Sequence, residues 1–260
     1  MRLIRFESTD GTLHTGRLVD DHAAQLLKTE LGEALRFGET TVEVARLRAP
    51  VSPPNIFAIG RNYRAHVEET GARMPDSPLV FLKATTSVIG PNDAIELPAS
   101  APSEVDFEAE LAIVIGRRAR NIAPADALSH VLGYTCANDV SARDCQAGDK
   151  QWSRAKGFDT FCPLGPWIVT PDELDPNDCL IRSRLNGETM QESNTSKMLR
   201  GCQELISYLS HQFTLLPGTV ILTGTPEGVG FARTPPIFLT PGDRIEIEID
   251  GIGTLTNTVR

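Results

Sequence analysis

The chain has 260 residues, of which 25 are lysine or arginine and 34 are aspartate or glutamate, so its formal net charge is −9. Hydrophobic residues make up 40%, which suffices for a full-sized core and excludes disorder as the main state. The acidic balance argues against nucleic acid or an anionic membrane as a partner, because polyanion binding needs a basic patch. We find no signal peptide or membrane span. Five cysteines without a C-x-x-C motif fit a reducing compartment, so we expect a cytoplasmic protein.

The first 50 residues predict a small N-terminal α+β module. Residues 2–7 and 12–19 have the pattern of strands, with a turn at Asp10-Gly11 between them, and residues 22–37 have that of a polar helix. Three prolines within residues 49–54 then mark a boundary. We therefore place the main domain at residues 51–260.

Short apolar runs separated by glycine, proline and aspartate dominate the main domain and predict strands. Two segments have helical character, residues 63–70 and 201–213, and the second carries an apolar face that fits against a sheet. Regular helical crossovers between the strands are absent. The main domain is therefore predicted to be β-rich, with an antiparallel or mixed sheet in an overall α+β fold. The predicted strands are residues 55–59, 79–82, 105–115, 132–137, 168–169, 220–222 and 245–249.

Two glutamates stand in the predicted strand 105–115. Because side chains alternate along a strand, Glu108 and Glu110 share one face, and that face becomes apolar just beyond them. Two like charges at the edge of an apolar face need a cation or a shared proton. A pair of solvated glutamates at a strand end is an equally consistent interpretation.

Asp139 follows the predicted strand 132–137 and precedes a turn or helix start, where Ser141 and Asp144 have the spacing of a capping box. Taken alone, Asp139 fits a capping role. If it converges with Glu108 and Glu110, the three form an all-oxygen site that suits Mg²⁺ or Mn²⁺. A lysine ammonium group in the place of that ion would count against the metal site.

A glycine-rich turn, residues 222–230, follows the predicted strand 220–222. It lacks the ending of a P-loop, and Pro235-Pro236 prevents the helix that a dinucleotide site requires. What remains is a purely structural turn, or one whose N–H groups and hydroxyls of Thr223 and Thr225 hold a substrate carboxylate.

His66 and Glu69 are three residues apart on the predicted helix 63–70. The carboxylate can hold the imidazole in one tautomer for use as a general base, although a solvated surface pair has the same spacing. The turn-rich segment 70–78 has the composition of a mobile lid. Lys83 and Lys156 are single cations between apolar residues, which either extend to solvent or face an anionic substrate.

In combination these segments resemble the fumarylacetoacetate hydrolase family. The matching stretches run in family order from about residue 55 to the C-terminus, and the ordered set is far more specific than any single stretch. Residues 1–50 resemble only loosely the small N-terminal region of many members. The stretches are residues 60–66 (GRNYRAH) with Glu69, 81–83 (FLK), 105–111 (VDFEAEL), 138–144 (NDVSARD), 156–161 (KGFDTF) and 222–230 (LTGTPEGVG).

The resemblance implies a β-rich mixed sandwich or roll, a homodimer, and a site for Mg²⁺ or Mn²⁺. It implies that Glu108, Glu110 and Asp139 are the metal ligands and that His66 and Glu69 form a lid dyad that activates water. It also implies that Lys156 takes part in catalysis. Positions facing the substrate or water are implied for Arg143, Gln146, Thr225 and Lys83.

The implied chemistry starts from a small 2-oxo acid or its enol, whose enolate the metal stabilises. The hydrolase version, which we place first, has His66 activate a water that cleaves a C–C bond of an acylpyruvate or fumarylpyruvate. The alternative is an isomerase, tautomerase or decarboxylase of the same substrates. Residues 230–239 resemble members of that second group, the hydroxymuconate and hydroxyheptadienedioate isomerases and the oxaloacetate tautomerases. A binding protein that has lost its activity is a further alternative, but His66, Glu69 and Lys156 are all retained.

Overall fold

A computed structural model describes all residues from 1 to 260 and shows two main β-sheets with four short α-helices. The larger sheet has 12 strands, and its main path runs β4-β3-β2-β1-β14-β12-β11-β17-β6-β7. Its strands are β1 (Arg2–Glu7), β2 (Leu13–Asp20), β3 (Ala23–Leu27), β4 (Phe37–Glu43), β5 (Arg46–Arg48), β6 (Ile56–Gly60), β7 (Leu79–Lys83), β8 (Val88–Ile89), β11 (Ala109–Ile115), β12 (Val131–Asn138), β14 (Cys162–Val169) and β17 (Val220–Leu222).

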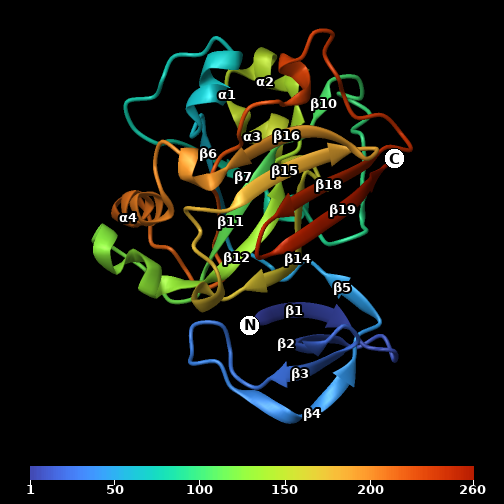
Figure 1. Cartoon of the computed structure of the whole chain (residues 1–260), viewed down its shortest axis with the longest axis vertical. Helices are drawn as coiled ribbons and strands as arrows, with labels where there is room; N and C mark the ends of the chain where they lie inside the picture. Colours follow the sequence, from blue (N-terminus) through green and yellow to red (C-terminus); the bar gives the residue numbers. More distant parts are fainter.

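The second sheet has five strands in the order β16-β15-β18-β19-β9. A two-stranded ribbon pairs β10 with β13, and β13 contacts α2 and α3. Figure 1 shows β10 at the end of the molecule that bears these helices. The remaining strands and the α-helices are β9 (Ala94–Ile95), β10 (Val105–Asp106), β13 (Ser141–Ala142), β15 (Leu180–Leu185), β16 (Glu188–Asn194), β18 (Arg244–Ile249), β19 (Gly253–Val259), α1 (Arg64–Glu69), α2 (Arg143–Asp149), α3 (Trp152–Gly157) and α4 (Cys202–Gln212).

The core lies on both faces of β11, which is why that strand is apolar almost throughout. Leu111 and Ile113 belong to a cluster of 37 buried residues that includes Ile181 and Ile247 of the smaller sheet. Ala112 and Val114 point the other way, into a cluster of 13 buried residues. The two sheets thus pack face to face over β11, β12 and β14. The predicted β-rich sandwich is confirmed.

Most of the predicted main-domain elements are confirmed with small shifts at their ends, but the strand predicted at residues 168–169 is only the end of the longer β14 (Cys162–Val169). The strand predicted at residues 220–222 has those bounds as β17, and the helix predicted at residues 201–213 is α4 (Cys202–Gln212). The single strand predicted at residues 105–115 is wrong, because Phe107 and Glu108 interrupt it and leave β10 and β11. The predicted capping box is also wrong: Ser141 lies in β13 and its hydroxyl donates to the carbonyl of Asp139.

The N-terminal module is all-β, so the helix predicted at residues 22–37 and the α+β character of the module are wrong. Ala24 and Leu26 alternate inward from β3 and pack against Ile4 and Phe6 of β1. Period-two burial therefore outweighs the helical pattern. Gly32, with φ of +107°, turns the chain between β3 and β4. These strands lie at one end of the molecule and join the larger sheet where β1 pairs with β14 (Figure 1).

Candidate active site

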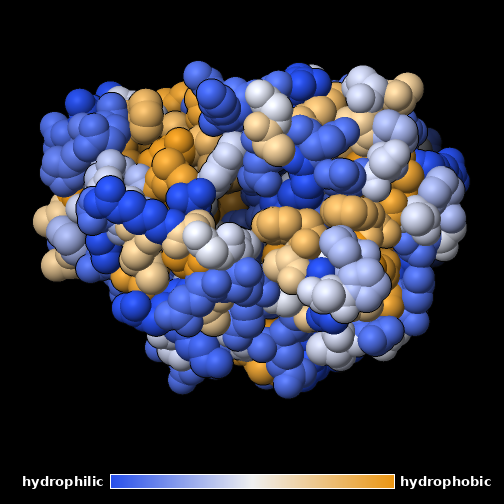
Figure 2. Space-filling view, turned by 90° about the horizontal axis from the view of Figure 1, so that it is seen from above, coloured by the Kyte–Doolittle hydropathy of each residue, from blue (hydrophilic) through white to orange (hydrophobic).

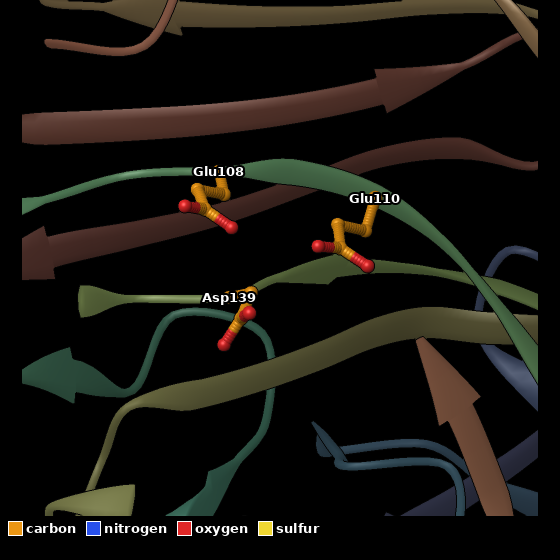
Figure 3. A group of neighbouring side chains, drawn as sticks. All are labelled: Glu108, Glu110 and Asp139. Atoms are coloured by element: carbon orange, nitrogen blue, oxygen red, sulfur yellow. The ribbon is translucent and has the colours of Figure 1, made fainter. Parts of the chain in front are cut away.

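Three buried carboxylates converge where β11 and β12 lie side by side. The antiparallel register pairs Ala109 with Asn138, and the Asp139 N–H donates to the Glu108 carbonyl at 2.9 Å. One oxygen from each of Glu108, Glu110 and Asp139 lies within 4.8 Å of the other two. Figure 3 shows Glu108 and Glu110 on one stretch of chain and Asp139 at the end of the neighbouring strand. The convergence that the sequence left open is therefore present.

Between β10 and β11 the backbone N–H groups are bonded to side chains and not to a neighbouring strand. The Asn138 side-chain oxygen accepts from the Glu108 N–H at 3.0 Å, and Asp106 accepts from the Phe107 N–H at 2.8 Å. Buried backbone donors need such partners. These contacts fix the backbone on which Glu108 is mounted.

Three buried cations surround the carboxylates. Lys156 of α3 bridges two of them, with its ammonium nitrogen 2.7 Å from Glu108 and 2.6 Å from Asp139. Lys83 of β7 lies 2.5 Å from the other oxygen of Asp139 and is fully buried behind it. The guanidinium of Arg143 is 2.8 Å from Glu108.

A fourth carboxylate, Asp106, holds the guanidinium of Arg143 at 2.8 Å. Asp106 also accepts backbone N–H bonds from Gly230 and Phe231. It belongs to β10, whose pairing with β13 brings it beside Arg143 at the start of α2. Sequence reasoning missed Asp106, since only the β10–β13 ribbon reveals what it contacts.

The electrostatic surroundings separate Glu108 from Glu110. Burial alone would raise the pKa of Glu108, but the charges of Lys156 and Arg143 outweigh it and lower that pKa to about 2. Glu110 has no cation in contact and accepts one backbone hydrogen bond, from the Gly224 N–H at 2.6 Å. Burial and the negative charges of Asp139 and Glu108 raise the pKa of Glu110 well above its ordinary range. Glu110 is thus the carboxylate that lacks a counter-charge.

These residues fit a hard divalent cation. Mg²⁺ and Mn²⁺ prefer oxygen donors, and Glu108, Glu110 and Asp139 supply only oxygens. The absence of a cation in contact with Glu110, whose carboxylate is buried beside two others, is the second observation in favour of a bound cation.

The two threonines of the glycine-rich turn have different positions: one stabilises the turn and the other faces the cavity. The Thr223 hydroxyl donates to the Leu111 carbonyl at 2.9 Å, so it secures the turn and does not face the cavity. Gly224 has φ of +98°, and a Cβ there would lie 2.7 Å from that of Asn62. Thr225 lines the cavity, and its oxygen accepts from the Gln191 amide at 2.8 Å.

Gln191 is a buried residue of β16 that sequence reasoning missed. Its amide nitrogen donates to Thr225 and to the Pro226 carbonyl, and its oxygen accepts from the Ala109 N–H and the Ser183 hydroxyl. Because Gln191 donates to the Thr225 oxygen, the hydroxyl hydrogen of Thr225 is free for another acceptor. No local signal in the sequence marks Gln191, since β16 itself was not predicted.

His66 and Glu69 form the predicted pair on α1. The His66 Nδ1 lies 2.8 Å from Glu69, whose second oxygen accepts from the Gly228 N–H at 2.8 Å. An ionised carboxylate only accepts hydrogen bonds, so Nδ1 is the donor, and in the neutral imidazole Nε2 then keeps its lone pair. Nε2 has no hydrogen-bond partner in the protein, and His66 lines the cavity. The arrangement is that of an oriented general base.

A single cavity of about 610 Å³ joins these groups. Figure 2 views the end of the molecule that bears α1 and α2, where a hollow lies between hydrophilic and hydrophobic side chains. Lys83 does not line the cavity, so in this structure it faces Asp139 and not the cavity space. Gln146 lines it and accepts from Arg143 at 3.0 Å. The predicted site residues that line the cavity are His66, Glu108, Glu110, Asp139, Arg143, Gln146, Lys156 and Thr225.

The fold and this cavity define an oxygen-donor site with an adjacent base, and comparison with known proteins identifies the class. The family model described as "Fumarylacetoacetate (FAA) hydrolase C-terminal" matches residues 55–260. The chain belongs to this family and is an enzyme of it.

Three relatives illustrate how similar the chain is to known members. It is 42% identical over 288 residues to a mitochondrial oxaloacetate tautomerase of Xenopus laevis, covering 100% of this chain and 90% of the relative. It is similar to the crystal structure of 5-carboxymethyl-2-hydroxymuconate delta-isomerase from Mycobacterium smegmatis, with 46% identity, a TM-score of 0.89 and coverage of 100% and 99%. It is also similar to the crystal structure of 2-hydroxyhepta-2,4-diene-1,7-dioate isomerase from Mycobacterium marinum, with 43% identity and a TM-score of 0.86. That match covers 100% of this chain and 98% of the other.

The names of these relatives favour the isomerase and tautomerase alternative over the C–C hydrolysis that we placed first. None of the helices meets the length and apolarity that crossing a membrane requires.

Proposed function

We propose that this enzyme interconverts the keto and enol forms, or double-bond isomers, of small 2-oxo acids. The observation that carries the proposal is that His66, which is paired with Glu69, lines the same cavity as the three carboxylates. The names of the relatives support this direction over hydrolysis. We further propose that the enzyme is a homodimer.

Mg²⁺ or Mn²⁺ would be held by Glu108, Glu110 and Asp139. When bound, such an ion supplies a Lewis acid that stabilises the negative charge of an enolate. The Thr225 hydroxyl, directed by Gln191, is placed to donate to the carboxylate of the substrate. Lys156 brings an ammonium group to the same end of the cavity.

The proton transfer is assigned to His66. Its Nε2 removes a proton from the carbon next to the 2-oxo group, and the C–H electron pair becomes the new C–C double bond. The electron pair of the C=O bond moves to the oxygen, whose charge Lys156 helps to balance until a proton is added there. Glu69 keeps the imidazole in the required tautomer and stabilises its protonated form.

C–C hydrolysis is the second candidate, since the matched family model bears the name of a hydrolase and His66 can equally take a proton from water. Water would then attack the distal carbonyl of an acylpyruvate, and a pyruvate enolate would leave. Decarboxylation of oxaloacetate would break the bond between C3 and C4 of the keto form, so that CO₂ leaves and the electron pair of that bond forms the same pyruvate enolate.

A substrate panel tests the proposal. Oxaloacetate, a hydroxymuconate-type acid, an acylpyruvate and fumarylpyruvate are assayed in weakly catalytic buffer, with Mg²⁺ or Mn²⁺ added to protein treated with EDTA. We expect metal-dependent loss of the enol absorbance of oxaloacetate without formation of pyruvate. Cleavage of fumarylpyruvate with no acceleration of tautomerisation would replace the proposal by hydrolysis.

A further inference from the structure

The cavity contains one cation whose role the site described above leaves unexplained. Arg143 and Lys156 are both paired with carboxylates. Arg61 also lines the cavity, yet its guanidinium makes no hydrogen bond and has no carboxylate within 4.0 Å. A half-buried guanidinium without an anion is a ready site for one.

The backbone around Arg61 is built to hold this side chain in place. Arg61 has φ of +58°, a conformation that is uncommon for residues other than glycine. Next to it, the Asn62 side chain donates to the carbonyls of Thr223 and Arg200 at 2.8 and 3.0 Å. On the other side, a Cβ at Gly60 would lie only 2.3 Å from the Trp152 ring. Such a conformation persists where the surroundings enforce it, and it often marks a functional position.

Arg61 stands at one end of an aromatic wall, and Lys156 stands at the other. The Arg61 guanidinium carbon is 5.8 Å from the centroid of the Trp152 ring. The rings of Trp152 and Phe81 are 5.3 Å apart, and the Lys156 ammonium lies 5.3 Å from Phe81. All four residues line the cavity. An apolar wall with a positive group at each end suits a flat molecule with an anionic group at each end.

We propose that Arg61 binds the distal carboxylate of the substrate and thereby selects 2-oxo dicarboxylic acids over monocarboxylic ones. The proposal rests on the proposed function and adds the substrate class. The reacting end of the substrate lies beside Lys156 and the three carboxylates, and its conjugated middle lies along Phe81 and Trp152. The far carboxylate then meets the guanidinium of Arg61, which can donate two parallel hydrogen bonds.

The test compares oxaloacetate with its 4-methyl ester, which keeps the skeleton but lacks the distal charge. Tautomerisation of both is measured with Mg²⁺ for the wild type, Arg61→Gln, Arg61→Lys and Arg64→Gln. Arg64 is exposed on α1 and lies outside the cavity, which makes Arg64→Gln a matched control. Melting temperatures establish that each variant is folded, and calorimetry measures the binding of both compounds.

We expect kcat/KM of Arg61→Gln for oxaloacetate to fall by roughly ten- to a hundredfold, as the loss of a charged hydrogen-bond partner implies. The value for the ester should stay within about twofold, because the ester has no charge for Arg61 to bind. Arg61→Lys should recover part of the loss, and Arg64→Gln should match the wild type. Equal losses for both substrates, or no loss for either, would overturn the role of Arg61 while leaving the proposed function intact.

If the wild type tautomerises neither compound, the proposed function fails and the calorimetry still decides about Arg61. Weaker binding of oxaloacetate to Arg61→Gln, with unchanged binding of the ester, would support the distal carboxylate site. Equal affinity of the wild type and Arg61→Gln for oxaloacetate would refute it.

Discussion

Replacing Glu110 with glutamine tests whether this site is built around a divalent cation. Glu110 is buried, contacts no cation and has a pKa that burial and two neighbouring carboxylates raise. The amide oxygen of glutamine can still accept the Gly224 N–H, so Glu110→Gln removes the charge with little change in shape. We expect the metal-free variant at pH 8 to be at least as stable as the metal-free wild type, and the variant to lose metal-dependent stabilisation.

The expected direction of the stability change follows from the linkage between protonation and folding. When the pKa of a carboxyl group is higher in the folded protein than in the unfolded chain, the stability it contributes is present at low pH and is lost as pH rises. At pH 8 the wild-type side chain costs stability that glutamine does not. For metal, a concentration 100 times the Kd stabilises the folded state by about 2.7 kcal/mol. With an unfolding entropy of roughly 2.1 cal/mol/K per residue, this corresponds to about 5 °C in Tm.

Loss of one charged ligand should weaken metal binding at least about a hundredfold. At the same metal concentration the metal then stabilises the folded variant by only about 0.4 kcal/mol, which corresponds to a rise in Tm of less than about 1 °C. The assay is differential scanning calorimetry in EDTA and in Mg²⁺. Glu188→Gln is the control, because Glu188 is exposed at the start of β16 and forms no ion pair. A full metal-dependent shift in Glu110→Gln, or a less stable metal-free variant, would contradict the reasoning.

Two further substitutions separate the base from the groups that position the substrate. His66→Asn should lower kcat of the proposed reaction by about 10²- to 10⁴-fold, while the metal-dependent change in Tm stays at the wild-type value; unchanged turnover would remove His66 from the mechanism. Gln191→Leu should raise KM by roughly tenfold with a smaller change in kcat, since the Thr225 hydroxyl loses the donor that orients it. Steady-state kinetics measures both, and a loss confined to kcat would show that Gln191 does not act through substrate binding.

Local patterns in the sequence were sufficient for the elements that hold the carboxylates. Alternation placed Glu108 and Glu110 on the same side of the chain, and the apolar run after them predicted a strand with two buried faces. The contact of Asp139 with Glu108 depends on the pairing of β11 with β12, which joins residues about 30 positions apart. Pairing over that separation has no local signal, so only the resemblance to a family predicted it.

The strands β3 and β15 were missed for two different physical reasons. β3 has only five residues, Ala23–Leu27, and its strand character comes from the packing of Ala24 against β1 rather than from propensity. In β15, Ile181, Ser183 and Leu185 are buried and alternate with two arginines, but the polar Ser183 in the middle of the buried face obscures the pattern. The position of Gln191 depends on the pairing of β15 with β16. Because neither strand was predicted, the residue that orients Thr225 was missed as well.

The position of Lys156 bears directly on whether a metal belongs here, because its ammonium group already lies between two of the three carboxylates. The ammonium group of Lys156 has three N–H donors, but it pairs with only these two carboxylates. It leaves Glu110 without a counter-charge, although burying an unpaired carboxylate is costly.

With every group ionised, the four carboxylates of the cluster exceed the three cations Lys83, Lys156 and Arg143 by one charge. A bound dication would reverse this balance to one positive charge, which would attract an anionic substrate. In the proposed reaction Lys156 would therefore complement a metal ion, because its ammonium group would be available to the carboxylates before the substrate binds and to the enolate oxygen afterwards.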